Sequence, residues 1–168
     1  MAVIHESSLS LTTARAPAGP KTYAVWLTGF LTLFILRVVG QILVATGHSP
    51  WLPPMEHWYS GLIPYPVLLP IQVALIILMT FVIRDIARAF GRFSRAHTTR
   101  GLFLKRFSYL YALFMVARYI ITMSLHPEYR WLSHTIPIWF HFVLAAFVYT
   151  CGHYQIAFAP QSRSAPHK

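Results

Sequence analysis

Apolar residues gather in long stretches along the chain, and short polar segments separate them. A transmembrane helix needs about 20 predominantly apolar residues to cross about 30 Å of hydrocarbon. The stretches that come close to this length are residues 22–46, 66–83, 107–124 and 136–158. The pattern therefore predicts an all-α integral membrane protein, with four transmembrane helices in an antiparallel bundle.

Basic residues flank these stretches almost entirely on one side of the predicted membrane. Arg130 alone falls on the other side. Because cytoplasmic loops carry an excess of Lys and Arg, both chain termini are predicted to be cytoplasmic. The chain then divides into a flexible N-terminus, a membrane domain and a disordered tail, at residues 1–21, 22–158 and 159–168. A bacterial inner membrane is the expected location, since no organellar or retention signal is convincing.

Arginines recur at helical spacing between the second and third stretches, with apolar residues on the opposite face. They are Arg84, Arg88, Arg92 and Arg95. The spacing predicts an amphipathic basic helix on the cytoplasmic interface, bound to the anionic headgroups of membrane lipids. A plain orientation signal is an equally good interpretation.

The two predicted outer loops share a Pro-Trp-Ser-Ile-Pro pattern at a constant offset. Pro54, Trp58, Ser60, Ile63 and Pro64 in the first loop recur as Pro127, Trp131, Ser133, Ile136 and Pro137. The pattern suggests two repeated helical hairpins. Interfacial Trp, a Ser N-cap and Pro in the first turn are also favoured wherever a helix starts at the outer interface, so both interpretations stay open.

Composition narrows the class of protein further. The 168 residues are 56% hydrophobic and 11% charged, whereas ordinary soluble domains are about 25% charged. The net charge of +10 would suggest nucleic acid in a polar sequence. Here the basic residues alternate with apolar stretches, so a nucleic-acid partner is not expected. Cys151 is the single cysteine, which excludes an internal disulfide and a thiolate metal cage.

Arg37 and Arg118 lie within predicted spans, where a charge costs about 2.5 to 3.5 kcal/mol and marks a functional candidate. At about 1.5 Å per residue, both lie in the outer half of the membrane, at a depth similar to that of Gln41, Gln72 and His141. No span contains Asp or Glu. We expect an outward-facing pocket in which Arg37, Gln41, Gln72 and Arg118 bind an anionic or polar-headed lipid, isoprenoid or quinone-like molecule.

Histidines and carboxylates cluster in the outer loops. The candidates for acid–base catalysis are His141, Glu56, His57 and Glu128. Candidate metal ligands are His48, His126 and His134. Solvated histidines, and arginines that pair with Glu56 and Glu128, are the structural alternatives. A metal ion or a surface haem stays open as cofactor, but a transmembrane b-type haem is not expected, because His141 and His153 lie far apart on one predicted helix.

Two functions remain after this reading. The first is ligand binding, with or without catalysis, in the outer pocket. The alternative is a non-catalytic accessory or assembly subunit whose aromatic surface faces a protein partner in the membrane. Arg37, Gly40 and a glycine at the end of the first span resemble part of the small four-helix membrane proteins of the DoxX-like kind. This resemblance is short and implies nothing about activity.

Overall fold

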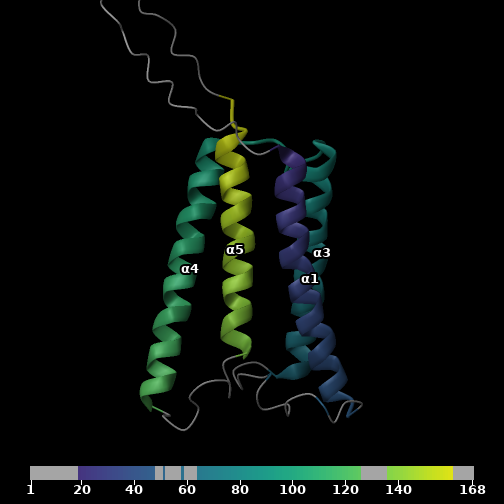
Figure 1. Cartoon of the computed structure of the whole chain (residues 1–168), viewed down its shortest axis with the longest axis vertical. Helices are drawn as coiled ribbons and strands as arrows, with labels where there is room; N and C mark the ends of the chain where they lie inside the picture. The colour runs from purple at the N-terminus through teal and green to yellow at the C-terminus, as the bar shows by residue number, and fades with distance from the viewer. Residues whose placement is uncertain (1–18, 48–50, 52–57, 59–63, 126–135, 161–168) are drawn as a thin grey trace, which may run out of the picture.

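The computed structural model describes residues 19–47, 51, 58, 64–125 and 136–160. Within them the chain is helical and contains no strand. Its helices are α1 (Pro20–Ala45), α3 (Tyr65–Arg88), α4 (Thr98–Leu125) and α5 (Ile136–Ala157) (Figure 1). Three of them, α1, α3 and α4, are long and apolar enough to cross a membrane. The predicted all-helical membrane character is thus confirmed.

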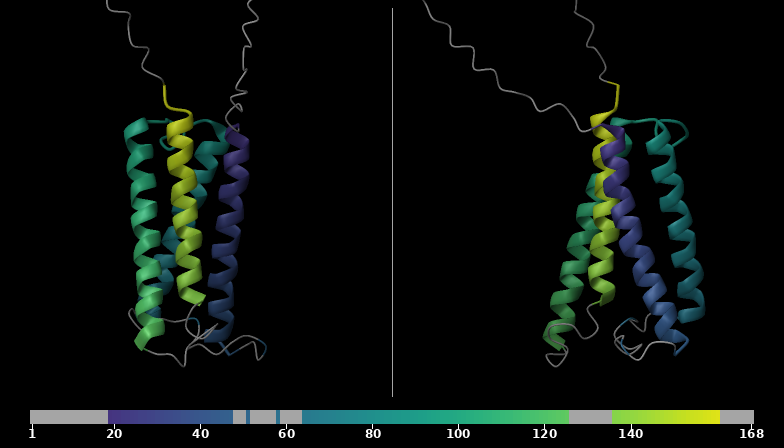
Figure 2. Two further views of the ribbon diagram at one scale, coloured as in Figure 1. Left: turned by 60° about the vertical axis from the view of Figure 1, so that its left-hand side comes forward. Right: turned by 45° about the vertical axis from the view of Figure 1, so that its right-hand side comes forward.

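The helices lie side by side in the order α3, α1, α5, α4. Helix α1 packs against α3 and α5, and α5 also packs against α4. The same order runs across the right-hand view of Figure 2. The start of α1, the end of α5 and the loop joining α3 to α4 lie at one end of the molecule (Figure 1). We call this the basic end, because Arg88, Arg92, Arg95 and Arg100 lie there.

The core lies between α1, α3 and α5. Leu27 and Phe34 of α1 are buried there with Ile86 of α3 and Tyr154 of α5. Many large apolar side chains elsewhere are exposed, and Trp26 of α1 reaches 64%. In water such a surface would favour aggregation, but hydrocarbon is its natural solvent. The distribution of apolar side chains therefore agrees with helices that face lipid.

Helices α4 and α5 approach closely where two glycines meet. A Cβ atom on Gly101 would lie 2.8 Å from the carbonyl oxygen of Gly152, and one on Gly152 would lie 3.0 Å from that of Gly101. Both distances are shorter than normal contacts, so neither position has room for a side chain. Small residues allow this kind of backbone approach between membrane helices, where packing replaces the hydrophobic effect.

The prediction of a separate amphipathic helix after the second span is wrong. Helix α3 continues through Arg84 and Arg88, beyond the predicted limit at residue 83. It ends where Ala89 and Gly91 adopt left-handed backbone conformations, with φ of 49° and 109°. Residues 89–97 form turns and bends, and α4 then starts at Thr98, well before the predicted residue 107. Hydropathy locates the hydrocarbon-crossing part of a helix, whereas backbone geometry decides where the helix stops.

Side chains from α3 and α5 hold this loop in place. The Asp85 carboxylate accepts a hydrogen bond of 3.2 Å from the backbone N–H of Phe93. The Gln155 amide donates to the carbonyl oxygen of Phe93 and accepts from the N–H of His97, both at 2.9 Å. Tyr154 donates its hydroxyl to the carbonyl oxygen of Ser94 at 3.2 Å. The loop is therefore tied to the end of α5.

Candidate functional site

Arg37 lies in the interior, on the face of α1 that carries Phe34 and Val38. Its side chain is only 8% exposed. The guanidinium carbon lies 5.4 Å from the centre of the Phe140 ring, within cation–π range. Its Nε has no hydrogen-bond partner among the described residues. Asp85, the one acidic residue described, lies at the basic end of α3. A buried cation in this setting needs a compensating group.

Gln41 follows Arg37 by one helical turn and faces Gln72 of α3. The two side chains are 0% and 3% exposed. Gln72 Nε2 donates a 3.0 Å hydrogen bond to Gln41 Oε1. This leaves Gln41 Nε2 and Gln72 Oε1 buried without partners among the described residues, and each such group costs about 1 to 3 kcal/mol. We call Arg37, Gln41 and Gln72 the Arg37 cluster.

A hydrogen-bonded pair from α4 and α5 lies near the cluster. The hydroxyl of Tyr111 and Nδ1 of His141 are 2.5 Å apart. Both arginines predicted from the sequence, Arg37 and Arg118, lie close enough to interact electrostatically with this pair. Gln41 and Gln72 are thus in direct contact one turn from Arg37, whereas Arg118 is connected to these residues only by its charge interaction with Tyr111 and His141. Sequence analysis missed Tyr111, because a tyrosine on an aromatic-rich helix is indistinguishable from a packing residue.

The remaining predicted site residues belong to the two outer loops. His48, Glu56, His57, His126, Glu128 and His134 lie outside the described residues, so their roles as catalysts or metal ligands stay predictions. In the part that the structure does describe, no group of three His, Cys, Asp or Glu residues could hold a metal ion. Trp58 is the loop residue that the structure connects to the site. A Cβ on Gly40, next to Gln41, would lie 2.7 Å from the Trp58 ring.

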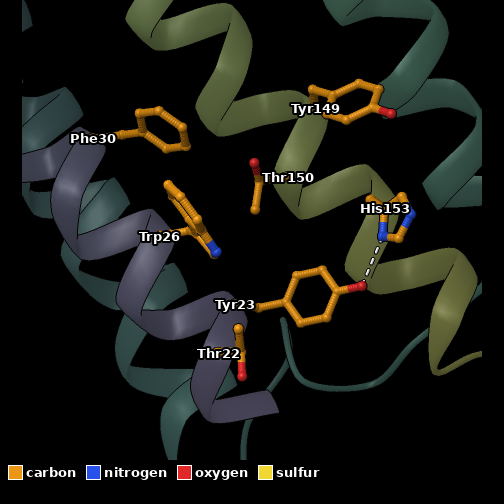
Figure 3. A pocket seen from close by; sticks show the side chains of 7 residues that line it. All are labelled: Thr22, Tyr23, Trp26, Phe30, Tyr149, Thr150 and His153. Carbon is orange, nitrogen blue, oxygen red and sulfur yellow. Dashed lines mark hydrogen bonds between the residues drawn. The ribbon is translucent and has the colours of Figure 1, made fainter. Parts of the chain in front are cut away.

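A second polar pair, which sequence analysis did not select, lies near the basic end. The hydroxyl of Tyr23 on α1 is 2.7 Å from Nδ1 of His153 on α5, and their rings stack at 5.7 Å. Beside them is a cavity of about 320 Å³, across which α1 and α5 side chains face each other (Figure 3). The hydrogen bond and the ring contact join α1 directly to α5, so we interpret the pair as a link between the two helices.

The sequence and the fold were both compared with known proteins. No model of a known protein family matches the chain, and no curated protein or solved structure matches it. The functional conclusion therefore depends on the geometry of the site.

Proposed function

We propose that the chain is a four-span antiparallel membrane protein that binds an anionic amphiphile at the Arg37 cluster. The observation that supports this most strongly is the set of buried atoms without partners: Arg37 Nε, Gln41 Nε2 and Gln72 Oε1. Packed interiors normally satisfy such groups with protein or water. A ligand head that satisfies all three would explain why they are retained in an apolar interior.

The chemistry of these atoms defines the head of the ligand. Arg37 and the Gln41 amide offer donors and a positive charge, which suit a phosphate or carboxylate oxygen. Gln72 Oε1 offers an acceptor, which suits a hydroxyl or a protonated oxygen on the same head. An acidic lipid or an isoprenoid phosphate fits this set better than a neutral quinone. The exposed apolar surfaces of α1 and α3 would receive its tail.

Binding, rather than catalysis, is the better-supported activity. The Nδ1 atom of His141 is already engaged by Tyr111. The other proposed proton carriers, Glu56, His57 and Glu128, lie outside the described residues. The distribution of basic residues supports an orientation in which the basic end is cytoplasmic and the cluster lies in the outer half of the membrane. A bacterial inner membrane remains the proposed location.

The arrangement of α4 favours the accessory subunit as a second candidate. Among the described helices, α4 packs against α5 alone. Its free side carries exposed aromatic residues, including Phe103 and Phe114. A protein partner could cover this surface in place of lipid. Co-purification of a stoichiometric membrane protein, lost when Phe103 and Phe114 are both changed to Ala, would support the subunit role.

The binding proposal is tested by titrating the purified protein in a neutral detergent with dodecyl phosphate, and separately with dodecanol. Arg37→Gln removes the charge at the site, and Arg106→Gln removes an exposed charge on α4 as the matched control. Losing a charge-assisted hydrogen bond of about 1.5 to 3 kcal/mol should weaken phosphate binding about 10- to 150-fold in Arg37→Gln. Equal affinity for the alcohol, or equal affinity in both variants, would contradict the proposal.

A further inference from the structure

A basic cavity lies in the loop between α3 and α4. Its volume is about 530 Å³, and its wall includes Arg92, Arg95, Arg100, Ser94 and His97. No acidic side chain lines it among the described residues. The nearby carboxylate of Asp85 is engaged by the backbone N–H of Phe93. Three arginines line one hollow, a composition that suits a multivalent anion, and phosphate is one of the anions whose geometry a guanidinium matches.

A more apolar cavity borders this one. The neighbouring cavity of about 740 Å³ shares Arg92 and Arg100 with it. It adds Phe103 and Leu104 of α4 and Gln155 of α5. Arg92 and Arg100 therefore lie between a polar and an apolar cavity, so a hydrocarbon substituent on a phosphate bound to them would lie close to apolar side chains.

A third cavity extends the path along the helices. It has a volume of about 230 Å³ and shares Phe93, Leu104 and Gln155 with the second. Its remaining wall is apolar and comes from α3, between Leu75 and Ile86, and from α5, between Leu144 and Cys151. At about 1.5 Å per residue, the α3 wall is about 16 Å long. A cavity with this lining would suit an extended hydrocarbon chain parallel to the helices, and we call it the chain slot.

The backbone of the loop is held in place by the protein itself. Gln155 and Tyr154 fix the loop to α5 through hydrogen bonds to its backbone. Gln155 also lines both apolar cavities, so one residue supports the loop and borders the chain slot. A preformed site avoids much of the entropy cost of ordering a loop on binding.

We propose that this end of the molecule binds one acidic phospholipid, with the phosphate on Arg92, Arg95 and Arg100 and one acyl chain between α3 and α5. The charge of the hollow selects an anionic head, and the apolar continuation selects a lipid over a soluble phosphate. The site is separate from the Arg37 cluster, and neither proposal depends on the other.

Native mass spectrometry of the full chain in neutral detergent tests the site with three probes: phosphatidylglycerol, phosphatidylcholine with the same chains, and inorganic phosphate. In the Arg37→Gln background, which removes the charge of the Arg37 cluster, phosphatidylglycerol should bind with one-to-one stoichiometry and the other two much more weakly. The variant R92Q/R95Q/R100Q should bind it about 100-fold more weakly, at about fivefold per arginine. The control R84Q/R88Q/R106Q changes the same charge at exposed residues outside these cavities and should keep most of the affinity.

A second pair of variants tests the chain slot. Val148→Phe fills the third cavity, whereas Val116→Phe adds the same bulk to an exposed position on α4. Only the first should weaken phosphatidylglycerol binding, and phosphatidylglycerol should slow thiol modification of Cys151, which lines the slot. Equal loss in both arginine triples, or inorganic phosphate that competes as well as the lipid, would overturn the proposal. So would unchanged lipid binding in a folded Val148→Phe variant.

Discussion

Gly101→Ala should force α4 and α5 apart. The new Cβ would lie 2.6 Å from the Cγ1 atom of Ile156, 2.8 Å from the carbonyl oxygen of Gly152 and 3.0 Å from the backbone nitrogen of Ile156. Two of these three atoms belong to the backbone of α5, so the clash cannot be relieved by rotating a side chain. Overpacking of this kind costs about 1 to 3 kcal/mol.

The matched control is Gly29→Ala in α1, where an added Cβ meets nothing within 4 Å. Both substitutions gain the same helix propensity, up to about 1 kcal/mol. The difference between the two variants therefore isolates the cost of separating the helices.

Cys151 is the natural reporter, because it is the single cysteine, is 9% exposed and precedes Gly152. Its rate of modification by a small thiol reagent in detergent measures how often α5 opens locally. A cost of about 1 to 3 kcal/mol corresponds to modification about 5 to 150 times faster in Gly101→Ala than in Gly29→Ala. If the two variants react at the same rate, the close glycine contact is not a feature of the protein.

Three further substitutions test other contacts. In Gly40→Ala the new Cβ would lie 2.7 Å from the ring of Trp58, so the ring should be displaced and the melting temperature in detergent should fall. A melting temperature equal to that of Gly29→Ala would contradict the contact. Tyr111→Phe removes the hydrogen bond to His141 and should cost about 0.5 to 1.5 kcal/mol of unfolding free energy, measured by denaturant titration; no loss would contradict the pair. Gln155→Leu removes two hydrogen bonds to residues 93 and 97 and should speed hydrogen exchange in that loop alone, so protection that stays unchanged would refute its role.

The sequence was enough to locate the apolar cores of the helices and to select three polar residues that are buried in the structure. Arg37, Gln41 and Gln72 were selected because hydrocarbon penalises polar groups, and that penalty acts on any fold. These residues come together because they lie at similar levels along their helices and because buried polar groups need hydrogen-bond partners. The hydrogen bond between Gln41 and Gln72 joins two side chains at the same level and gives each of them a partner.

Three features depend on details that hydropathy does not encode. Hydropathy places the end of α3 too early, because Arg84 and Arg88 interrupt the apolar stretch but are compatible with a helix. The helix ends at the left-handed backbone of Ala89, and an alanine gives no sequence signal for that conformation. The α3, α1, α5, α4 order depends on side-chain packing, including the Gly101–Gly152 contact. The link from Gln155 to the loop joins segments distant in sequence and could not be predicted from either one.

The most direct measurement is the identity of the small molecule that co-purifies with the chain, determined by mass spectrometry after gentle extraction. The account predicts that the R92Q/R95Q/R100Q chain, in which the lipid site at the basic end is weakened, still holds a stoichiometric acidic amphiphile, and that adding Arg37→Gln to this chain depletes it whereas adding the exposed-charge control Arg106→Gln does not. Neutral lipids alone in the R92Q/R95Q/R100Q chain, or an acidic amphiphile held equally with and without Arg37→Gln in that chain, would contradict the claim that the buried arginine binds the ligand.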